Sequence, residues 1–282
     1  MKNFLIITNE QRDADLLVTN SITDYISLKG GTSKSFVSNK SNWSSLYQTA
    51  DLLETSAECV IVIGGDGTLV RCARALSKKQ IPVIGVNLGT LGYLCELEKE
   101  NLFEAIDRIF EDNYEIEQRM MIKGYKPGET QVVRAQNDIV IFRSGRLQVI
   151  NLIVRVDGEY LTTYTADGII IATPTGSTGY SMSAGGPIVD PKTRMVVLTP
   201  INAHDLHSRS IMLDDDAVIE IELAPRRPEL DEMVDVTFDG DVFRTMKVGE
   251  RFVIESANTP VKILKLNKMS FLQILRKKMN HE

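Results

Sequence analysis

The sequence predicts an α/β domain with an open, mostly parallel sheet at the N-terminus, followed by a β-rich C-terminal domain. Two observations support this fold class. Over residues 1–105, short apolar runs alternate with segments of helical periodicity, which is typical of βαβ units. Over residues 106–267, short strand-like runs follow one another, and several are joined by Asp-Gly turn pairs. The length of 282 residues is ample for two domains of ordinary size.

The elements expected in the first domain alternate between strand and helix. In order, they are a strand at 4–8, a helix with apolar positions 16, 17, 22 and 26, a strand at 59–63, a helix from Thr68, a strand at 81–86 and a helix over 100–113. The last of these, ENLFEAIDRIFEDN, is clearly amphipathic.

The second domain is expected to consist mainly of antiparallel strands. These strands are predicted at 131–135, 138–143, 147–158, 159–164, 168–172, 194–200, 217–223, 233–240 and 251–256. The C-terminal segment 268–282 returns to helical spacing, and we expect it to pack back on the first domain.

Composition narrows the class of protein. The net charge of −6 and the pI near 5.3 argue against a nucleic-acid or anionic-membrane binder, since both surfaces attract basic proteins. No apolar run approaches the ~18 residues of a membrane helix. Three cysteines without CxxC spacing indicate free thiols in a reducing compartment, so we expect a cytoplasmic protein.

The stretch VIVIGGDGTLV (60–70) places Asp66 between glycines at the end of a buried strand. Glycines at 64, 65 and 67 let the backbone approach a ligand, and a following helix favours phosphate. The spacing matches neither the Walker loop nor GxGxxG. Since a carboxylate repels phosphate, Asp66 has a separate role, which is either to take a proton from an attacking hydroxyl or to hold a magnesium ion. The structural alternative is an Asx-type turn or an N-cap for the helix near Thr68.

Two further stretches are rich in glycine or small hydroxyls. GVNLGTLGYL (85–94) follows the next strand, so it is expected beside the first loop. ADGIIIATPTGSTGYSMSAGGPIVDP (166–191) combines small hydroxyls, which can bind a ribose or a base edge, with Tyr180, which can cover a base. His204 and His207 have no third ligand nearby, so we interpret them as loop residues and expect no protein metal site.

Taken together, these motifs resemble the NAD kinases, which make NADP. The resemblance is carried, in family order, by GGDGT (64–68), GVNLGTLGYL (85–94), QND (136–138), DG…TPTGSTGYS (167–181) and HDLHSRSIML (204–213). GGDG alone is shared with diacylglycerol kinases, sphingoid kinases and 6-phosphofructokinases, which do not share the TPTGST stretch. The resemblance implies an active site in the crevice between the two domains.

The resemblance also assigns roles to individual residues. Asp66 matches the aspartate thought to deprotonate the ribose 2′-hydroxyl, and Gly67 and Arg71 match positions near the dinucleotide phosphates. Asn137 and Asp138 match a pair that holds ribose hydroxyls, and Asp167 matches an acid at the nicotinamide end. The run that contacts the adenosine corresponds here to Thr178, Gly179, Tyr180, Ser181, Met182 and Ser183.

Several positions depart from the family pattern. Gly179 replaces a commoner alanine, Thr165 stands where some members carry arginine, and Asp241 stands where glutamine is frequent. Gln148 aligns with a binding position by counting from Asn137.

The function expected from this resemblance is an ATP-dependent NAD kinase that phosphorylates the 2′-hydroxyl of the adenosine ribose. Magnesium is expected to arrive with ATP, and the protein is expected to be a homo-oligomer, a dimer or a tetramer, without nucleic-acid or membrane partners. One alternative is a lipid kinase of the diacylglycerol or sphingoid type. The other is a non-catalytic NAD(H)-binding sensor.

Overall fold

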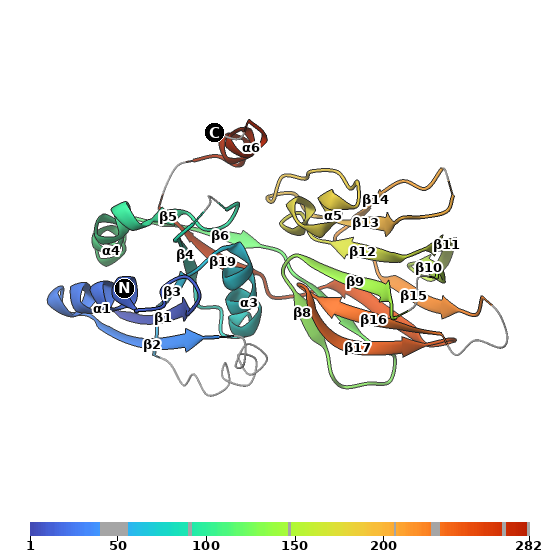
Figure 1. Cartoon of the computed structure of the whole chain (residues 1–282), viewed down its shortest axis with the longest axis horizontal. Helices are drawn as coiled ribbons and strands as arrows, with labels where there is room; N and C mark the ends of the chain where they lie inside the picture. Colours follow the sequence, from blue (N-terminus) through green and yellow to red (C-terminus); the bar gives the residue numbers. More distant parts are fainter. Residues whose placement is uncertain are drawn as a thin grey trace. The chain divides into compact units, whose positions relative to one another are not determined.

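The computed structural model describes residues 1–39, 56–89, 92–145, 148–205, 207–226, 232–266 and 269–280 (Figure 1). The chain forms two compact units, Met1–Gln118 with Pro260–Glu282, and Arg119–Thr259. The first unit therefore extends past the boundary expected near residue 105. The reason is that strands β6 (Glu115–Arg119) and β19 (Val261–Lys265) both join the sheet of the first unit.

The first unit contains a seven-stranded sheet in the order β2-β1-β3-β4-β19-β6, with β5 beside β4. Its other strands are β1 (Asn3–Asn9), β2 (Thr32–Ser38), β3 (Cys59–Ile63), β4 (Val83–Asn87) and β5 (Leu97–Glu98). Strands β1 to β5 pair in parallel, and β19 pairs in parallel with β4, as expected for βαβ units. Every residue of β3 and β4 is buried, which explains their continuous apolar sequences.

The helices of the first unit are α1 (Leu17–Leu28), α3 (Asp66–Leu76), η1 (Lys99–Asn101), α4 (Leu102–Phe110) and α6 (Phe271–Met279). Helices α1 and α4 share one apolar cluster with the sheet, in which Ile22, Ile26 and Ile109 are almost fully buried. Helix α3 packs through Leu69, close to Gly85 of β4. Helix α6 begins with a capping box, and Lys278 lies 5.1 Å from the centre of the Tyr93 ring. No described helix is long and apolar enough to cross a membrane.

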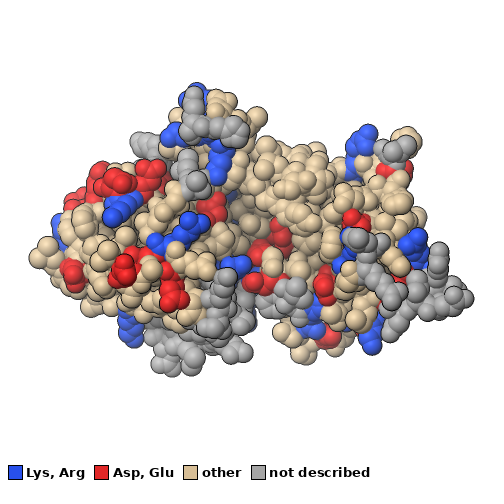
Figure 2. Space-filling model, in the orientation of Figure 1, with Lys and Arg blue, Asp and Glu red and all other residues tan. Residues whose placement is uncertain are grey.

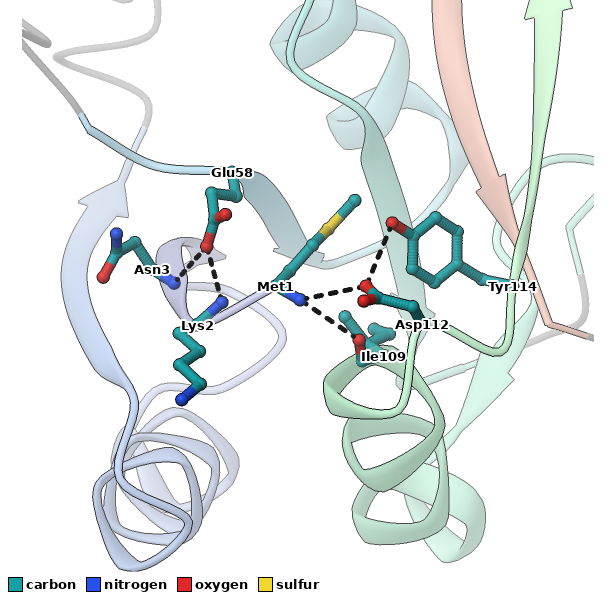
Figure 3. Close-up of polar contacts among 7 residues, drawn as sticks. All are labelled: Met1, Lys2, Asn3, Glu58, Ile109, Asp112 and Tyr114. Atoms are coloured by element: carbon teal, nitrogen blue, oxygen red, sulfur yellow. Dashed lines mark hydrogen bonds and ion pairs between the residues drawn. The ribbon is translucent and has the colours of Figure 1, made fainter.

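The start of β1 is fixed by polar contacts at the amino edge of the sheet (Figure 3). Glu58, just before β3, accepts backbone N–H bonds from Lys2 at 2.5 Å and Asn3 at 3.0 Å. These bonds lower the pKa of Glu58, because they favour its charged form. The terminal amine of Met1 lies 3.2 Å from Oδ1 of Asp112. β1 is thereby fixed beside β3, which keeps their carboxyl ends together.

The second unit contains two six-stranded antiparallel sheets, in the orders β11-β10-β15-β18-β7-β8 and β14-β13-β12-β9-β16-β17. The strands of the first are β7 (Ile122–Tyr125), β8 (Val133–Ala135), β10 (Ile150–Val156), β11 (Glu159–Ala166), β15 (Ile219–Ala224) and β18 (Arg251–Ser256). Those of the second are β9 (Asp138–Arg143), β12 (Gly168–Ala172), β13 (Met195–Ile201), β14 (Ile211–Asp214), β16 (Met233–Phe238) and β17 (Asp241–Lys247). Short helices η2 (Gly176–Thr178) and α5 (Tyr180–Ser183) follow β12.

Alternate side chains of both sheets form one core, in which the rings of Phe238 and Phe252 meet edge to face at 6.1 Å. The opposite face of β12 is also covered, because Ile170 packs in a second cluster with Val140 and Val189. This explains why all of GIIIA is buried, although most strands of this unit alternate. The chain after β12 therefore folds back over the outer face of the second sheet.

The Asp-Gly pairs form the hairpin turns predicted from the sequence. Asp157 and Gly158 have φ values of 54° and 82°, and Asp239 and Gly240 have values of 49° and 82°. Positive φ at both central residues is the pattern of a type I′ turn. The turns join β10 to β11 and β16 to β17, so the predicted hairpins are confirmed.

The three cysteines are buried, and charged side chains of both signs lie on the surface (Figure 2). Cys59, Cys72 and Cys95 are buried free thiols, and burial raises the pKa of Cys59 and of Cys72 to about 12. Such thiols are unreactive at neutral pH. Figure 2 shows acidic and basic side chains interspersed on the visible face.

Candidate functional site

Asp66 is the first residue of α3, immediately after the Gly64-Gly65 turn that ends β3. The N-cap of α3 is Gly65, and no side chain caps this helix. The capping interpretation of Asp66 is therefore wrong. Its carboxylate is directed instead at the loop after β4.

Three consecutive backbone N–H groups of that loop donate to Asp66. Oδ2 accepts from Tyr93 at 2.6 Å, and Oδ1 accepts from Leu94 at 3.1 Å and Cys95 at 3.0 Å. Gly92 passes so close that a Cβ added there would lie 2.0 Å from Oδ1. The second glycine-rich loop thus lies beside the first, as predicted from the parallel pairing of β3 and β4.

Other polar groups gather at the carboxyl edge of this sheet. Asn9, at the end of β1, donates to the hydroxyl of Thr68 at 3.3 Å. Gly67 is exposed, and Arg71 lies half-buried one helical turn further along α3. This edge therefore presents the open backbone and the cation that a phosphate group requires.

A cavity of about 610 Å³ opens at the same edge. It is formed by the loop after β1 and the segments that follow β4 and β5, and its lining includes Arg12, Asp15, Asn87, Gly89 and Lys99. Its volume is in the range of small-molecule sites.

In the second unit, three segments converge around residues 136–138 at the start of β9. The carboxylate of Asp239 accepts N–H bonds from Gln136 at 3.1 Å, Asn137 at 2.7 Å and Asp138 at 3.3 Å. The hydroxyl of Thr173 donates to the carbonyl of Gln136 at 2.6 Å. Asn137 and Asp138 are thus held from two sides, by the β16–β17 turn and by the end of β12.

Asp138 is 6% exposed. Burial, and then the negative charge of Asp239, raise the pKa of Asp138 to about 7. The loop after η2 borders this carboxyl group, since a Cβ added at Gly179 would lie 3.9 Å from both Asp138 Oδ2 and Asn137 Nδ2. The Cβ of an alanine at this position would make ordinary contacts with both.

The hydroxyl-rich run after β12 divides into a buried part and an exposed part. Ser177 is fully buried and donates to the carbonyl of Pro174 at 2.6 Å, and Ser181 is fully buried with its hydroxyl 3.0 Å from that of Thr199. The Ser181 hydroxyl thus supports the loop, and a contact of this residue with the adenosine stays a prediction. Tyr180, Met182 and Ser183 are exposed, and Thr178 is half-buried.

Asp167 immediately precedes β12, at the opposite end from Thr173, and Thr165 lies in β11. Asp167 forms an ion pair with Arg143 at 2.8 Å and accepts from Asn202 at 2.9 Å. Thr165 donates to Asn151 at 2.9 Å. At ~3.3 Å per residue, β12 separates Asp167 from Thr173 by roughly 20 Å. Within one chain, the structure therefore does not bring Asp167 or Thr165 to the Asn137–Asp138 cluster.

Gln148 and Asp241, the two remaining predicted site residues, make none of the contacts described above. Gln148 is exposed, before β10. Asp241 is the first residue of β17, opposite Phe238 and two residues after Asp239.

Sequence reasoning missed the residues that hold the candidate groups in place. Asp239 was interpreted only as a turn residue, although its carboxylate binds three amides. The amides of Tyr93, Leu94 and Cys95 have no side-chain signature. The available signal for them was Gly92, whose missing Cβ admits the carboxylate.

Comparisons with known proteins cover both units. A family model described as the ATP-NAD kinase N-terminal domain matches residues 7–114, and one described as the ATP-NAD kinase C-terminal domain matches residues 136–266. An NAD kinase of Agathobacter rectalis is 52% identical over 281 residues, covering 100% of this chain and 99% of that protein. An NAD kinase of Lachnospira eligens is 40% identical over 294 residues, covering 99% and 100% of the two chains.

Two solved structures share the fold. Yeast NADH kinase complexed with NADH has a TM-score of 0.81 at 22% identity, covering 99% of this chain and 88% of that one. An NAD kinase from Archaeoglobus fulgidus in complex with ATP has a TM-score of 0.79 at 22% identity, covering 99% of both chains. At this identity, the two structures support the fold alone, namely an α/β unit followed by a β-rich unit.

Proposed function

Because the chain belongs to the NAD kinase family, we propose that it transfers the terminal phosphoryl group of ATP to the adenosine ribose 2′-hydroxyl of NAD, giving NADP. The observation that carries this proposal is the placement of Asp66. One carboxylate, held by three amides, stands where a buried parallel strand meets the start of a helix. Ligands of open α/β sheets bind at such an edge.

In this mechanism, Asp66 accepts the proton of the 2′-hydroxyl as that oxygen attacks the terminal phosphorus and ADP leaves. Phosphoryl transfer depends mostly on positioning and on charge neutralisation. The backbone at Gly64, Gly65 and Gly67 and the N-terminus of α3 are suited to bind phosphate oxygens, and Arg71 adds a positive charge. The cavity lined by Arg12 and Asn87 has room for the donor nucleotide.

We assign the recognition of NAD to the second unit. Asn137 and Asp138 bind ribose hydroxyls, since a carboxyl group and an amide can accept and donate to vicinal hydroxyls. Tyr180 is 44% exposed, so its ring is available to cover a base. Gly67, Thr178, Gly179, Ser181, Met182, Ser183, Gln148 and Asp241 remain proposed contacts.

Magnesium fits this site as an ion bound to the nucleotide. Among the described residues, no three His, Cys, Asp or Glu side chains come together as a metal site. We assign no protein ligand to this ion, because three N–H donors already occupy much of the Asp66 carboxylate. When bound, magnesium neutralises part of the negative charge of the phosphates.

We propose that Asp167 contacts the nicotinamide in the site of a second copy of the chain. Since Asp167 lies roughly 20 Å from Thr173 along β12 at ~3.3 Å per residue, one chain does not present both to the same cluster. A homo-oligomer in which one protomer supplies Asp167 to the site of its partner would reconcile the two positions. The buried reduced thiols support a reducing compartment, and we place the protein in the cytoplasm.

The test is to incubate the protein with NAD, ATP and magnesium and to follow NADP formation. Identification of the product phosphate on the adenosine 2′-oxygen by ³¹P NMR would support the proposal. Binding of NAD without any NADP would contradict it. Parallel reactions with polyphosphate as donor and NADH as acceptor define the substrate range.

A further inference from the structure

The loop after β4 controls the orientation of the Asp66 carboxylate. Tyr93, Leu94 and Cys95 each donate a backbone N–H to it, over distances of 2.6 to 3.1 Å. These donors come from three consecutive residues of one segment. Because Asp66 begins α3 without capping it, this loop is the main polar contact of the carboxylate among the described residues.

An ionised carboxylate has about four acceptor positions, two on each oxygen. In Asp66, Leu94 and Cys95 fill both positions of Oδ1, and Tyr93 fills one position of Oδ2. Among the described residues, Oδ2 accepts fewer backbone N–H bonds than Oδ1, so we assign Oδ2 to the substrate hydroxyl. The direction of Oδ2 is fixed, because rotation of the carboxylate would break three hydrogen bonds.

Gly92 makes this arrangement sterically feasible. A Cβ at this position would lie 2.0 Å from Oδ1, 2.4 Å from Cγ and 2.6 Å from Oδ2 of Asp66. Real Cβ atoms do not approach other heavy atoms this closely, so any other residue would displace the carboxylate or the loop. Gly92 is not among the residues with positive φ, so the requirement for glycine is steric.

We propose that Gly92 and the amides of residues 93–95 position the catalytic base, leaving Oδ2 of Asp66 as the atom that receives the proton. This inference rests on the proposed function. In the reaction step, the O–H bond of the 2′-hydroxyl breaks and its proton passes to Oδ2. The electron pair on the 2′-oxygen forms the new bond to phosphorus, and the bond from phosphorus to the leaving ADP oxygen breaks.

Gly92→Ala tests this positioning role. We expect kcat to fall by about 10²-fold, the usual consequence of displacing a catalytic group by about 1 Å. KM for NAD should change by less than about threefold, because the substitution displaces only the Asp66 carboxylate and leaves the other NAD contacts in place. A variant with normal kcat would overturn the proposal.

A double-mutant cycle separates positioning from general damage to the fold. If Gly92 acts through Asp66, adding Gly92→Ala to Asp66→Asn produces no further loss of kcat, whereas independent effects would multiply. Multiplied losses would overturn the proposal.

Thermal unfolding gives a readout that does not depend on activity. Gly92→Ala should lower Tm in the wild type but not in Asp66→Ala, where the carboxylate that it would strike is absent. Equal losses of Tm in both backgrounds would contradict the steric role of Gly92. The wild-type NADP assay reports separately on the proposed function, so the two failures are distinguishable.

Discussion

Replacing Asp138 with asparagine should stabilise the second unit in a way that depends on pH. The carboxyl group of Asp138 is buried, and its pKa rises from the ordinary 3.8 to about 7. Below pH ~4, the group is protonated in the folded and the unfolded protein, so it contributes no difference. Between pH 4 and pH 7, the folded state retains a proton that the unfolded state releases, and stability falls as the pH rises.

The magnitude follows from the gap between the two pKa values. The gap spans about three pH units, and each unit corresponds to ~1.4 kcal/mol, so the cost of the buried carboxyl reaches roughly 4 kcal/mol above pH 7. An asparagine side chain has a similar shape and does not titrate. The unfolding free energy of Asp138→Asn minus that of wild type should therefore increase from pH 4 to pH 7 and level off above it.

Urea unfolding followed by far-UV circular dichroism between pH 4 and pH 8.5 measures this difference. Asp190→Asn, which removes an exposed carboxylate from the same unit, is the matched control for the loss of one charge. A difference between Asp138→Asn and wild type that stays constant with pH would refute the reasoning. It would mean that burial and Asp239 do not hold the pKa of Asp138 near 7 in the folded protein.

Three other perturbations test the contacts around the site. Asp239→Ala removes the acceptor of three N–H bonds, so it should lower the unfolding free energy by about 2–4 kcal/mol. Urea unfolding measures this change, and a loss below about 0.5 kcal/mol would contradict the supporting role of Asp239. Asp239→Asn removes the negative charge near Asp138, so the midpoint of an NMR titration of the Asp138 carboxyl carbon should shift to lower pH. An unchanged midpoint would show that Asp239 does not raise the pKa of Asp138. If Asp167 acts in the site of a partner protomer, mixed oligomers contain sites with both carboxylates intact. Mixing inactive Asp66→Asn chains with inactive Asp167→Ala chains should then restore part of the NADP-forming activity. Persistent inactivity after confirmed subunit exchange would count against a shared site.

Much of the fold could be predicted because local patterns and tertiary structure agree. CVIVI and IPVIGV indicated buried parallel strands, and the structure has β3 and β4 there with every residue buried. The Asp-Gly pairs at 157–158 and 239–240 predicted hairpins, because few other dipeptides adopt positive φ twice in succession.

The strands that were missed lack such a pattern. Strand β2 (TSKSFVS) lies at the edge of the sheet and is mostly not buried, so its sequence is polar. Strand β19 belongs to the first unit although it follows the whole second unit in sequence. Local periodicity carries no information about that return of the chain.

For the candidate site, the sequence indicated the chemical groups but not the contacts that hold them. Asp66 stood out because glycines surround it, yet its alternative interpretation as a helix cap could be rejected only from the structure. The hydroxyl run suggested ligand binding throughout, whereas Ser177 and Ser181 are buried and bond within the protein. The residue type alone does not distinguish a serine that supports a loop from one that binds a ribose, whereas burial in the structure does.

The most direct measurement is the steady-state rate of NADP formation by Asp66→Asn, made together with calorimetric titration of NAD binding. If Asp66 takes the ribose proton, turnover falls by ~10²–10⁴-fold while the affinity for NAD stays within a few-fold of wild type. Wild-type turnover by this variant would show that the proton goes elsewhere and that the role assigned to Asp66 is wrong.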